Sequence, residues 1–209
     1  MLNRYDPAAR TFLSTGALPD AGLLTDLVNA TGIGETHWRT RFNMGPSYYR
    51  VNLVPGTLLG RYDTRITLPS LNAGAETDPS SVLIGNSFGF RITEYLTQLG
   101  YTSPSSYTLL SNAIQSWRWE HEGNALPDTI PDLAAALAQN PRLKILAVNG
   151  YHDVATPFYT TELDLARLGN NPNVAVRNYM GGHMTYLDDT SRVRMKADLA
   201  EWYRSALAN

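Results

Sequence analysis

Two runs of strand length, the first of them mainly apolar, are separated by a helical pattern and constrain the fold more than any other feature of this sequence. They are residues 143–148 (LKILAV) and 174–179 (VAVRNY). Between them, residues 157–168 have a helical pattern that begins with a proline and is followed by Gly169. Strands joined by such a crossover helix pair in parallel and follow a right-handed path. We therefore expect a parallel βαβ unit near the end of the chain.

Helical patterns on both sides extend this unit. Residues 132–139 (DLAAALAQ) predict a short helix with Pro131 near its first position and Asp128 as a cap. A last helix is expected over residues 191–207, with an apolar face made of Val193, Leu199, Trp202 and Tyr203. The alternation of strands and helices predicts the α/β class, with a βαβα unit. The unbroken apolarity of the first strand favours coverage on both faces.

The first 126 residues have a different pattern. We expect a mainly helical region over residues 1–126 and an α/β region over residues 127–209. Local patterns in the first region predict a helix over 21–30, a strand or hairpin over 53–66 around Pro55-Gly56, a surface loop over 67–81 and a helix over 90–99.

Composition excludes several classes of protein and site. The 17 basic and 19 acidic residues form no basic cluster, so we expect no nucleic-acid partner. The absence of cysteine excludes disulfides, a thiol nucleophile and thiolate metal ligands. No apolar run approaches the roughly 20 residues that span a bilayer, and residues 1–6 lack the apolar segment of a signal peptide. We expect no membrane partner and no signal peptide on this chain.

Two titratable residues lie in the loops that follow the two strands. Asp153 follows the first strand, and His183 follows the second. Ligands and catalytic groups gather at the carboxyl ends of parallel strands. An acid followed by a histidine in this order fits the last two members of a Ser-Asp-His triad, in which the carboxylate orients the imidazole. Singly, such residues are usually a helix cap and a structural histidine, but the pair at two strand ends favours catalysis.

The residues around this pair resemble the C-terminal portion of serine carboxypeptidases of the α/β-hydrolase superfamily, nearest to the bacterial members. Segment 149–158 (NGYHDVATPF) is similar to the family's Gly-Tyr-x-Asp-hydrophobic-x-Thr-Pro motif, and segment 182–187 (GHMTYL) to its Gly-His-Met motif. Segment 60–65 (GRYDTR), Leu99-Gly100-Tyr101 with Trp117, and segment 196–199 resemble further landmarks. The resemblance covers most of the chain.

This resemblance implies a fold, an activity and roles for three residues. The fold is the C-terminal part of an α/β-hydrolase core, preceded by a cap. The activity is removal of the C-terminal residue of peptides through an acyl-enzyme, without a metal or cofactor. Asp153 is implied to be the triad acid and His183 the general base, while Met184 lines the pocket for the substrate's terminal residue. An exported enzyme, periplasmic or secreted, is also implied; the sequence itself leaves localisation unknown.

The sequence departs from the family at the nucleophile. The family's serine lies in a Gly-Glu-Ser-Tyr-Gly elbow before the cap, and this motif does not occur in the 209 residues. We therefore expect the chain to be a fragment that is inactive alone and that binds the missing N-terminal half of the hydrolase or associates with itself. Whether Met1 is a native start, which terminal residue is preferred and which oligomer forms are left open.

Two alternative functions remain from the sequence. Gly85-Asn86-Ser87-Phe88-Gly89 satisfies the G-x-S-x-G pattern and follows the apolar residues 82–84, which predicts a strand, an elbow and a helix. Ser87 is therefore a candidate nucleophile of a small self-contained esterase, although the pattern is loose and the strand short. The other alternative is a non-catalytic binding or assembly relative.

The other histidines, His37, His121 and His152, are expected to be packed or exposed. His121 has acidic neighbours, but one histidine with flanking acids is too little for a metal site.

Overall fold

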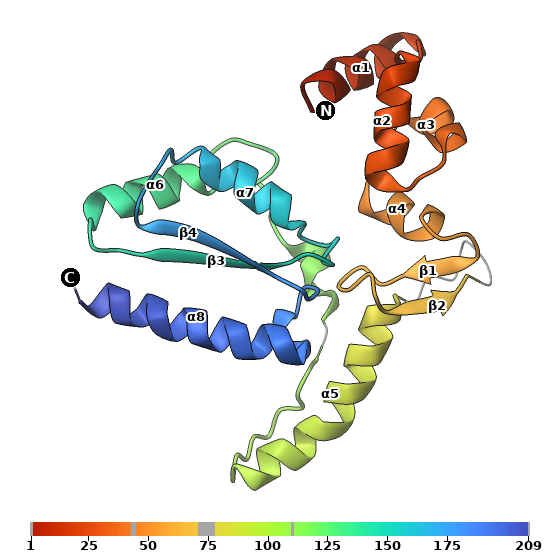
Figure 1. Ribbon diagram of the computed structural model, residues 1–209. Coiled ribbons are helices and arrows are strands. Elements are labelled where there is room, and N and C mark those ends of the chain that lie inside the picture. Colours follow the sequence, from red (N-terminus) through yellow and green to blue (C-terminus); the bar gives the residue numbers. More distant parts are fainter. Residues whose placement is uncertain (1, 43–44, 71–77, 110, 209) are drawn as a thin grey trace. The chain divides into compact units, whose positions relative to one another are not determined.

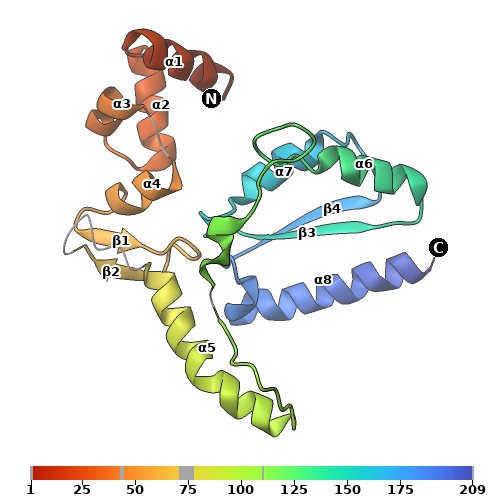
Figure 2. The ribbon, with the colours of Figure 1, turned by 180° about the vertical axis from the view of Figure 1, so that it is seen from behind.

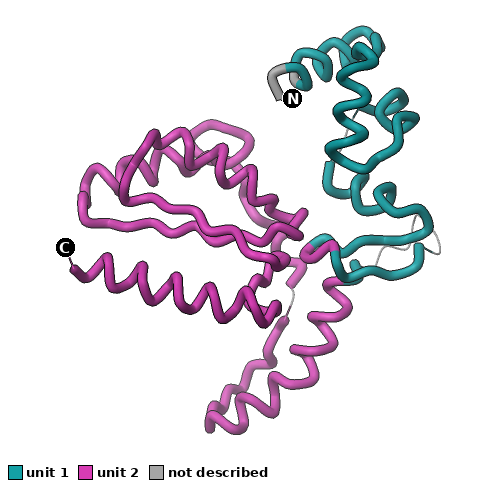
Figure 3. The backbone as a smooth tube through the Cα atoms, in the orientation of Figure 1, with its two compact units in different colours: residues 1–61, 65–79 teal, residues 62–64, 80–209 magenta. Residues whose placement is uncertain are grey.

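The computed structural model describes residues 2–42, 45–70, 78–109 and 111–208. They form two compact units, drawn in different colours in Figure 3. The first unit contains residues 1–61 and 65–79, and the second contains residues 62–64 and 80–209. The change of sequence pattern at residue 126 therefore falls inside the second unit. Helices and strands are mixed along the chain, as predicted for the broad α/β class.

Helices make up most of the first unit: α1 (Leu2–Thr15), α2 (Ala21–Thr31), α3 (Glu35–Arg41) and α4 (Pro46–Asn52) (Figure 1). The helix predicted over 21–30 is confirmed as α2. It begins after Asp20, whose carboxylate accepts a hydrogen bond from the Leu23 N–H at 2.9 Å, and it ends at Gly32, whose φ of 71° favours glycine. A buried hydrophobic cluster in this unit consists of Leu23, Leu24, Leu27, Trp38 and Phe42.

A short antiparallel hairpin follows α4. Its strands are β1 (Thr57–Leu59) and β2 (Thr67–Pro69). The sequence predicts a strand or hairpin around Pro55-Gly56, but these two residues lie before β1, in the turn that connects α4 to β1. Gly56 has a φ of 73° in this turn. The connection between the strands is residues 60–66 instead. Residues 71–77 of the predicted surface loop lie outside the described residues.

Helix α5 (Pro79–Gln98) corrects one prediction from the sequence. Residues 82–84 were expected to form a strand before an elbow, but they lie inside this continuous helix, which also contains the predicted helix over 90–99. A short apolar run fits a helix as well as a strand by periodicity alone, which explains the error. Gly85 and Gly89 are one helical turn apart and have open space where a Cβ would stand. Irregular chain and the short 3₁₀ helix η1 (Asn112–Ser116) follow.

The remaining elements confirm the predicted parallel βαβα unit. They are α6 (Ile130–Gln139), β3 (Ile145–Gly150), α7 (Phe158–Ala166), β4 (Val174–Tyr179), the 3₁₀ helix η2 (Thr185–Leu187) and α8 (Asp189–Leu207). Strands β3 and β4 pair in parallel, with Ile145 opposite Val174 and Gly150 opposite Tyr179. Figures 1 and 2 show α6 and α7 on one face of this pair and α8 on the other. This arrangement explains why residues 145–148, the first four of β3, are all apolar.

Helix α8 begins two residues before its expected start, and only part of its expected apolar face is packed. The Asp188 carboxylate accepts a hydrogen bond from the Ser191 N–H at 2.8 Å and caps the helix. Val193 and Tyr203 were expected on the packed face, but they are 70% and 65% exposed. The half-buried side chains include Met195, Asp198, Leu199 and Trp202. Within the described part of the chain, no helix is long and apolar enough to cross a membrane.

Tyr179, the last residue of β4, ties the sheet to α8. Its buried hydroxyl donates a hydrogen bond to Asp198 Oδ2 at 2.7 Å. Burial and the neighbouring Asp198 carboxylate raise the pKa of Tyr179 to about 12, from an ordinary value of 10.0. Because the folded state disfavours the phenolate, the stability from this neutral phenol is complete below pH 10. It is lost as the pH rises from 10 toward 12.

In Tyr179→Phe, the free energy of unfolding should therefore fall less steeply above pH 10 than it does in the wild type. Near neutral pH it should be lower than in the wild type by about 1 kcal/mol, because the hydrogen bond to Asp198 is missing. The measurement is the free energy of unfolding in urea at pH 7, 10 and 11. Tyr203→Phe is the matched control, because Tyr203 is an exposed tyrosine on α8, the helix that Tyr179 contacts. If the free energy of unfolding falls equally in Tyr179→Phe and in the wild type between pH 10 and 11, the loss of stability in this range does not come from Tyr179.

Candidate active site

The loops after β3 and β4 bring Asp153 and His183 into direct contact. His183 Nδ1 lies 2.8 Å from Asp153 Oδ2. The Asp153 side chain is 5% exposed, whereas that of His183 is 43% exposed. The carboxylate is therefore buried behind the imidazole, and the imidazole faces solvent. The other ring nitrogen, Nε2, has no hydrogen-bond partner among the residues that the structure describes.

Four hydrogen bonds hold the Asp153 carboxylate. Oδ1 accepts from the backbone N–H of Ala155 at 2.8 Å and of Thr156 at 3.0 Å. Oδ2 accepts from the Thr156 hydroxyl at 2.5 Å and lies beside His183. The turn forms because an aspartate side chain readily bonds backbone N–H groups two and three residues ahead. Both oxygens are thus satisfied, as a buried carboxylate requires.

Glycines allow the two site loops to approach each other. A Cβ on Gly150 would stand 2.1 Å from the carbonyl oxygen of Gly182. A Cβ on Gly182 would stand 2.2 Å from the carbonyl oxygen of Tyr62. Since both obstacles are backbone atoms, no side chain can move aside to relieve the contact. Glycine at these positions is therefore a packing requirement.

Residues 62–64 bridge the two loops. The Tyr62 carbonyl accepts a hydrogen bond from the His183 backbone N–H at 2.6 Å, and the Thr64 N–H donates to the His152 carbonyl at 3.0 Å. The Tyr62 ring packs on the imidazole of His183 at a centroid distance of 5.2 Å. In the sequence, Tyr62 is part only of segment 60–65, a landmark of the resemblance. A segment so distant along the chain gives no local sign that it contacts the histidine.

The other predicted residues lie as follows. Met184 is half-buried directly after His183, at the start of η2, and its role in substrate binding stays a prediction. Ser87 is exposed in the interior of α5, so it does not lie on the strand–elbow–helix turn that the alternative nucleophile requires. The hydroxyl in contact with the pair belongs to Thr156. Its position three residues after the aspartate was the available signal in the sequence.

The remaining histidines have contacts of their own. The His152 ring faces the Thr64 hydroxyl at 3.4 Å, and His37 is hydrogen-bonded to Tyr48. His121 Nε2 lies 3.4 Å from a carboxylate oxygen of Asp132. No group of three or more acidic or histidine side chains that could hold a metal ion occurs among the described residues.

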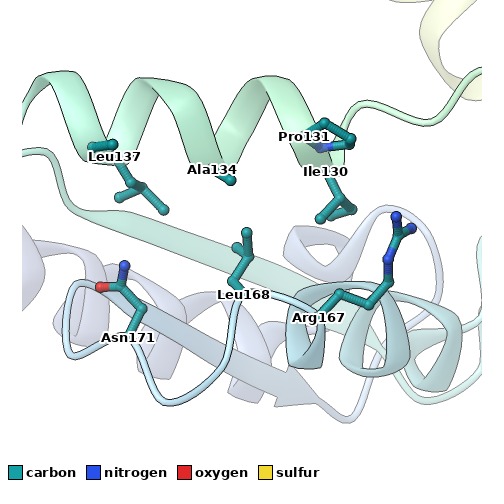
Figure 4. Close-up of a pocket in the computed structure, with 8 residues that line it drawn as sticks. Ile130, Pro131, Ala134, Leu137, Arg167, Leu168 and Asn171 are labelled. Atoms are coloured by element: carbon teal, nitrogen blue, oxygen red, sulfur yellow. The ribbon is translucent and has the colours of Figure 1, made fainter.

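A separate groove runs between α6 and the end of α7 (Figure 4). Its lining is mainly apolar and includes Leu137, Leu168 and Arg167. The Arg167 guanidinium donates hydrogen bonds to both carboxylate oxygens of Asp128, at 3.0 and 2.6 Å, and holds the pKa of Asp128 below its usual value. The charge of Arg167 is therefore already paired.

The geometry of the Asp153–His183 pair suits proton transfer. When Nδ1 carries the ring proton and donates it to Asp153, the lone pair of Nε2 is free to take a proton from a group in solvent. The buried carboxylate then stabilises the positive charge on the imidazole. The pair can therefore serve as a general base with a fixed orientation.

Comparisons with known protein families, with curated proteins and with solved structures find no match to this chain.

Proposed function

We propose that Asp153 and His183 are the acid and the base of a serine-type peptidase that removes the C-terminal residue of peptides, as serine carboxypeptidases do. The observation that carries the proposal is a buried carboxylate bonded to one ring nitrogen of an exposed histidine, whose other nitrogen is open. The two residues follow adjacent parallel strands in the chain order of an α/β-hydrolase triad. In this proposal, β3 and β4 are the last strands of a hydrolase core.

The proposed reaction has two steps. A serine hydroxyl attacks the carbonyl carbon of the last peptide bond, and its proton moves to His183 Nε2. The same proton then passes to the leaving amine, so that the terminal amino acid departs and an acyl-enzyme remains. Water next attacks the ester, His183 takes the proton of the water, and the serine is released with that proton. Asp153 keeps its charge and holds the imidazole throughout.

The proposed nucleophile comes from outside these 209 residues. The Thr156 hydroxyl contacts Nδ1, which is the wrong nitrogen for a nucleophile, and Ser87 lies within a helix. The sheet offers a place for another segment, because the described residues contribute two strands to it and each has an unpaired edge. Unpaired strand edges accept further strands. The proposed partner is the N-terminal half of the hydrolase, which adds its strands there; self-association is the alternative.

Labelling with a fluorophosphonate tests this proposal. The purified chain should take up no label and should hydrolyse no blocked dipeptide, since the loss of a triad nucleophile lowers kcat by about 10⁶. The same chain together with its proposed N-terminal half, expressed from the natural gene, should be labelled on a serine outside residues 1–209. This label should be lost in His183→Ala.

Two results contradict the proposal. A label on Ser87 that is lost in His183→Ala indicates a self-contained esterase. A chain that binds a partner equally well after Asp153→Ala and His183→Ala, with no labelled serine in the complex, indicates a binding or assembly protein. Mass spectrometry locates the adduct, and circular dichroism shows that each variant is folded.

A further inference from the structure

We infer that Thr156 is a positioning residue that helps Asp153 to select the tautomer of His183; its consequence for catalysis rests on the proposed function. Three atoms form a closed triangle at the site. Thr156 Oγ1 lies 2.5 Å from Asp153 Oδ2, Asp153 Oδ2 lies 2.8 Å from His183 Nδ1, and Thr156 Oγ1 lies 3.1 Å from the same Nδ1. Every pair in this triangle is within hydrogen-bond distance.

The distances determine where the hydroxyl proton lies. A separation of 2.5 Å is typical of a hydroxyl that donates to a charged carboxylate, which is a stronger bond than one to a neutral nitrogen. The Thr156 proton is therefore directed at Asp153 Oδ2. Because a hydroxyl has no second proton to donate, the Thr156 oxygen faces His183 Nδ1 with a lone pair.

This placement leaves Nδ1 facing two acceptors. If the ring proton were on Nε2, the lone pair of Nδ1 would meet the lone pairs of both Asp153 Oδ2 and Thr156 Oγ1. If the proton is on Nδ1, it can be shared between these two oxygens. The second arrangement is favoured, and it leaves the lone pair of Nε2 free. Thr156 thus reinforces the tautomer that a general base needs.

Thr156 is itself held in place by two bonds to the same carboxylate. Its backbone N–H donates to Asp153 Oδ1 and its hydroxyl donates to Oδ2. These bonds define the rotation of the carboxylate, so Oδ2 is presented to the imidazole in one orientation. Because the His183 side chain is 43% exposed, water can compete for its ring nitrogens, and a second acceptor at Nδ1 opposes this competition.

Nuclear magnetic resonance of the chain alone tests the inference without substrate or nucleophile. Long-range proton–nitrogen correlation of ¹⁵N-histidine-labelled protein, at about two pH units above the ordinary histidine pKa, reports which ring nitrogen carries the proton. Wild-type His183 should be protonated at Nδ1. Thr156→Val keeps the shape but removes the hydroxyl, and should shift both ring nitrogens toward a mixture of tautomers. Thr156→Ser keeps the hydroxyl and should restore the wild-type shifts.

Two outcomes overturn the inference: wild-type His183 protonated at Nε2, or a folded Thr156→Val variant with unchanged ring shifts. In the complete enzyme, Thr156→Val should lower kcat about tenfold or more with little change in KM, since proton transfer to a positioned base is impaired. If labelling finds no catalytic serine but the tautomer depends on Thr156 as described, the proposed function fails and the positioning inference holds.

Discussion

In the proposed peptidase, completed by its proposed N-terminal half, Asp153→Asn is expected to lower kcat/KM about 10⁴-fold. The asparagine amide keeps the shape of the carboxylate but can turn an N–H toward His183 Nδ1, which selects the wrong tautomer of the imidazole. It also removes the negative charge that stabilises the protonated ring. His183→Ala removes the base altogether and should cost about 10⁶ in kcat. The measurement is the steady-state hydrolysis of a blocked dipeptide.

The matched control is Asp132→Asn, which alters the other histidine–aspartate pair of the second unit. His121 and Asp132 are 3.4 Å apart at closest approach, but the side chain of Asp132 is 55% exposed. An exposed pair of this kind contributes little, so the control should keep nearly full activity. If Asp153→Asn retains more than about a tenth of the wild-type kcat/KM, Asp153 does not act as the orienting acid.

Gly150→Ala is expected to lower the free energy of unfolding by about 3 kcal/mol, because the added Cβ has no room beside the backbone of Gly182. The new Cβ would stand 2.1 Å from the carbonyl oxygen of Gly182. Relief requires the two site loops to separate. This movement stretches the hydrogen bond of 2.9 Å from the His152 N–H to the Gly181 carbonyl and draws His183 away from Asp153.

Urea unfolding at neutral pH measures this effect, and Gly89→Ala is the matched control in the same unit. Gly89 lies inside α5, and apart from the adjacent backbone of the helix itself no atom lies within 4 Å of the position of a Cβ. Alanine there should stabilise the helix by up to about 1 kcal/mol. Opposite signs for the two substitutions are the expected result. A loss of less than about 1 kcal/mol in Gly150→Ala shows that the loops can separate without breaking the site.

The sequence predicted the elements of the α/β region because their patterns are local. The strand expected over 174–179 is confirmed as β4, and the crossover helix and the last helix lie within two residues of their expected bounds. The failures were also local in origin. Residues 82–84 fit a strand and a helix equally well, and Pro55-Gly56 predicts a turn without saying which strands it connects.

Two residues of the expected α8 face were mispredicted for another reason. Val193 and Tyr203 are apolar enough to suggest burial, but they are exposed, while Asp198 is half-buried and bonded to Tyr179. Which side of a helix packs depends on what the sheet presents to it. Here a buried phenol on β4 selects a carboxylate on the helix, and no hydrophobic pattern encodes that choice.

The sequence by itself determined that Asp153 and His183 follow two parallel strands, because strand length, apolarity and the crossover helix are written in consecutive residues. Only the tertiary structure decided that the two side chains bond at 2.8 Å, that Thr156 closes the contact and that Tyr62 packs on the imidazole. The physical reason is the range of the interactions. Periodicity and capping act over a few residues, whereas the site depends on close approach between loops 30 residues apart, which glycine permits and backbone packing enforces.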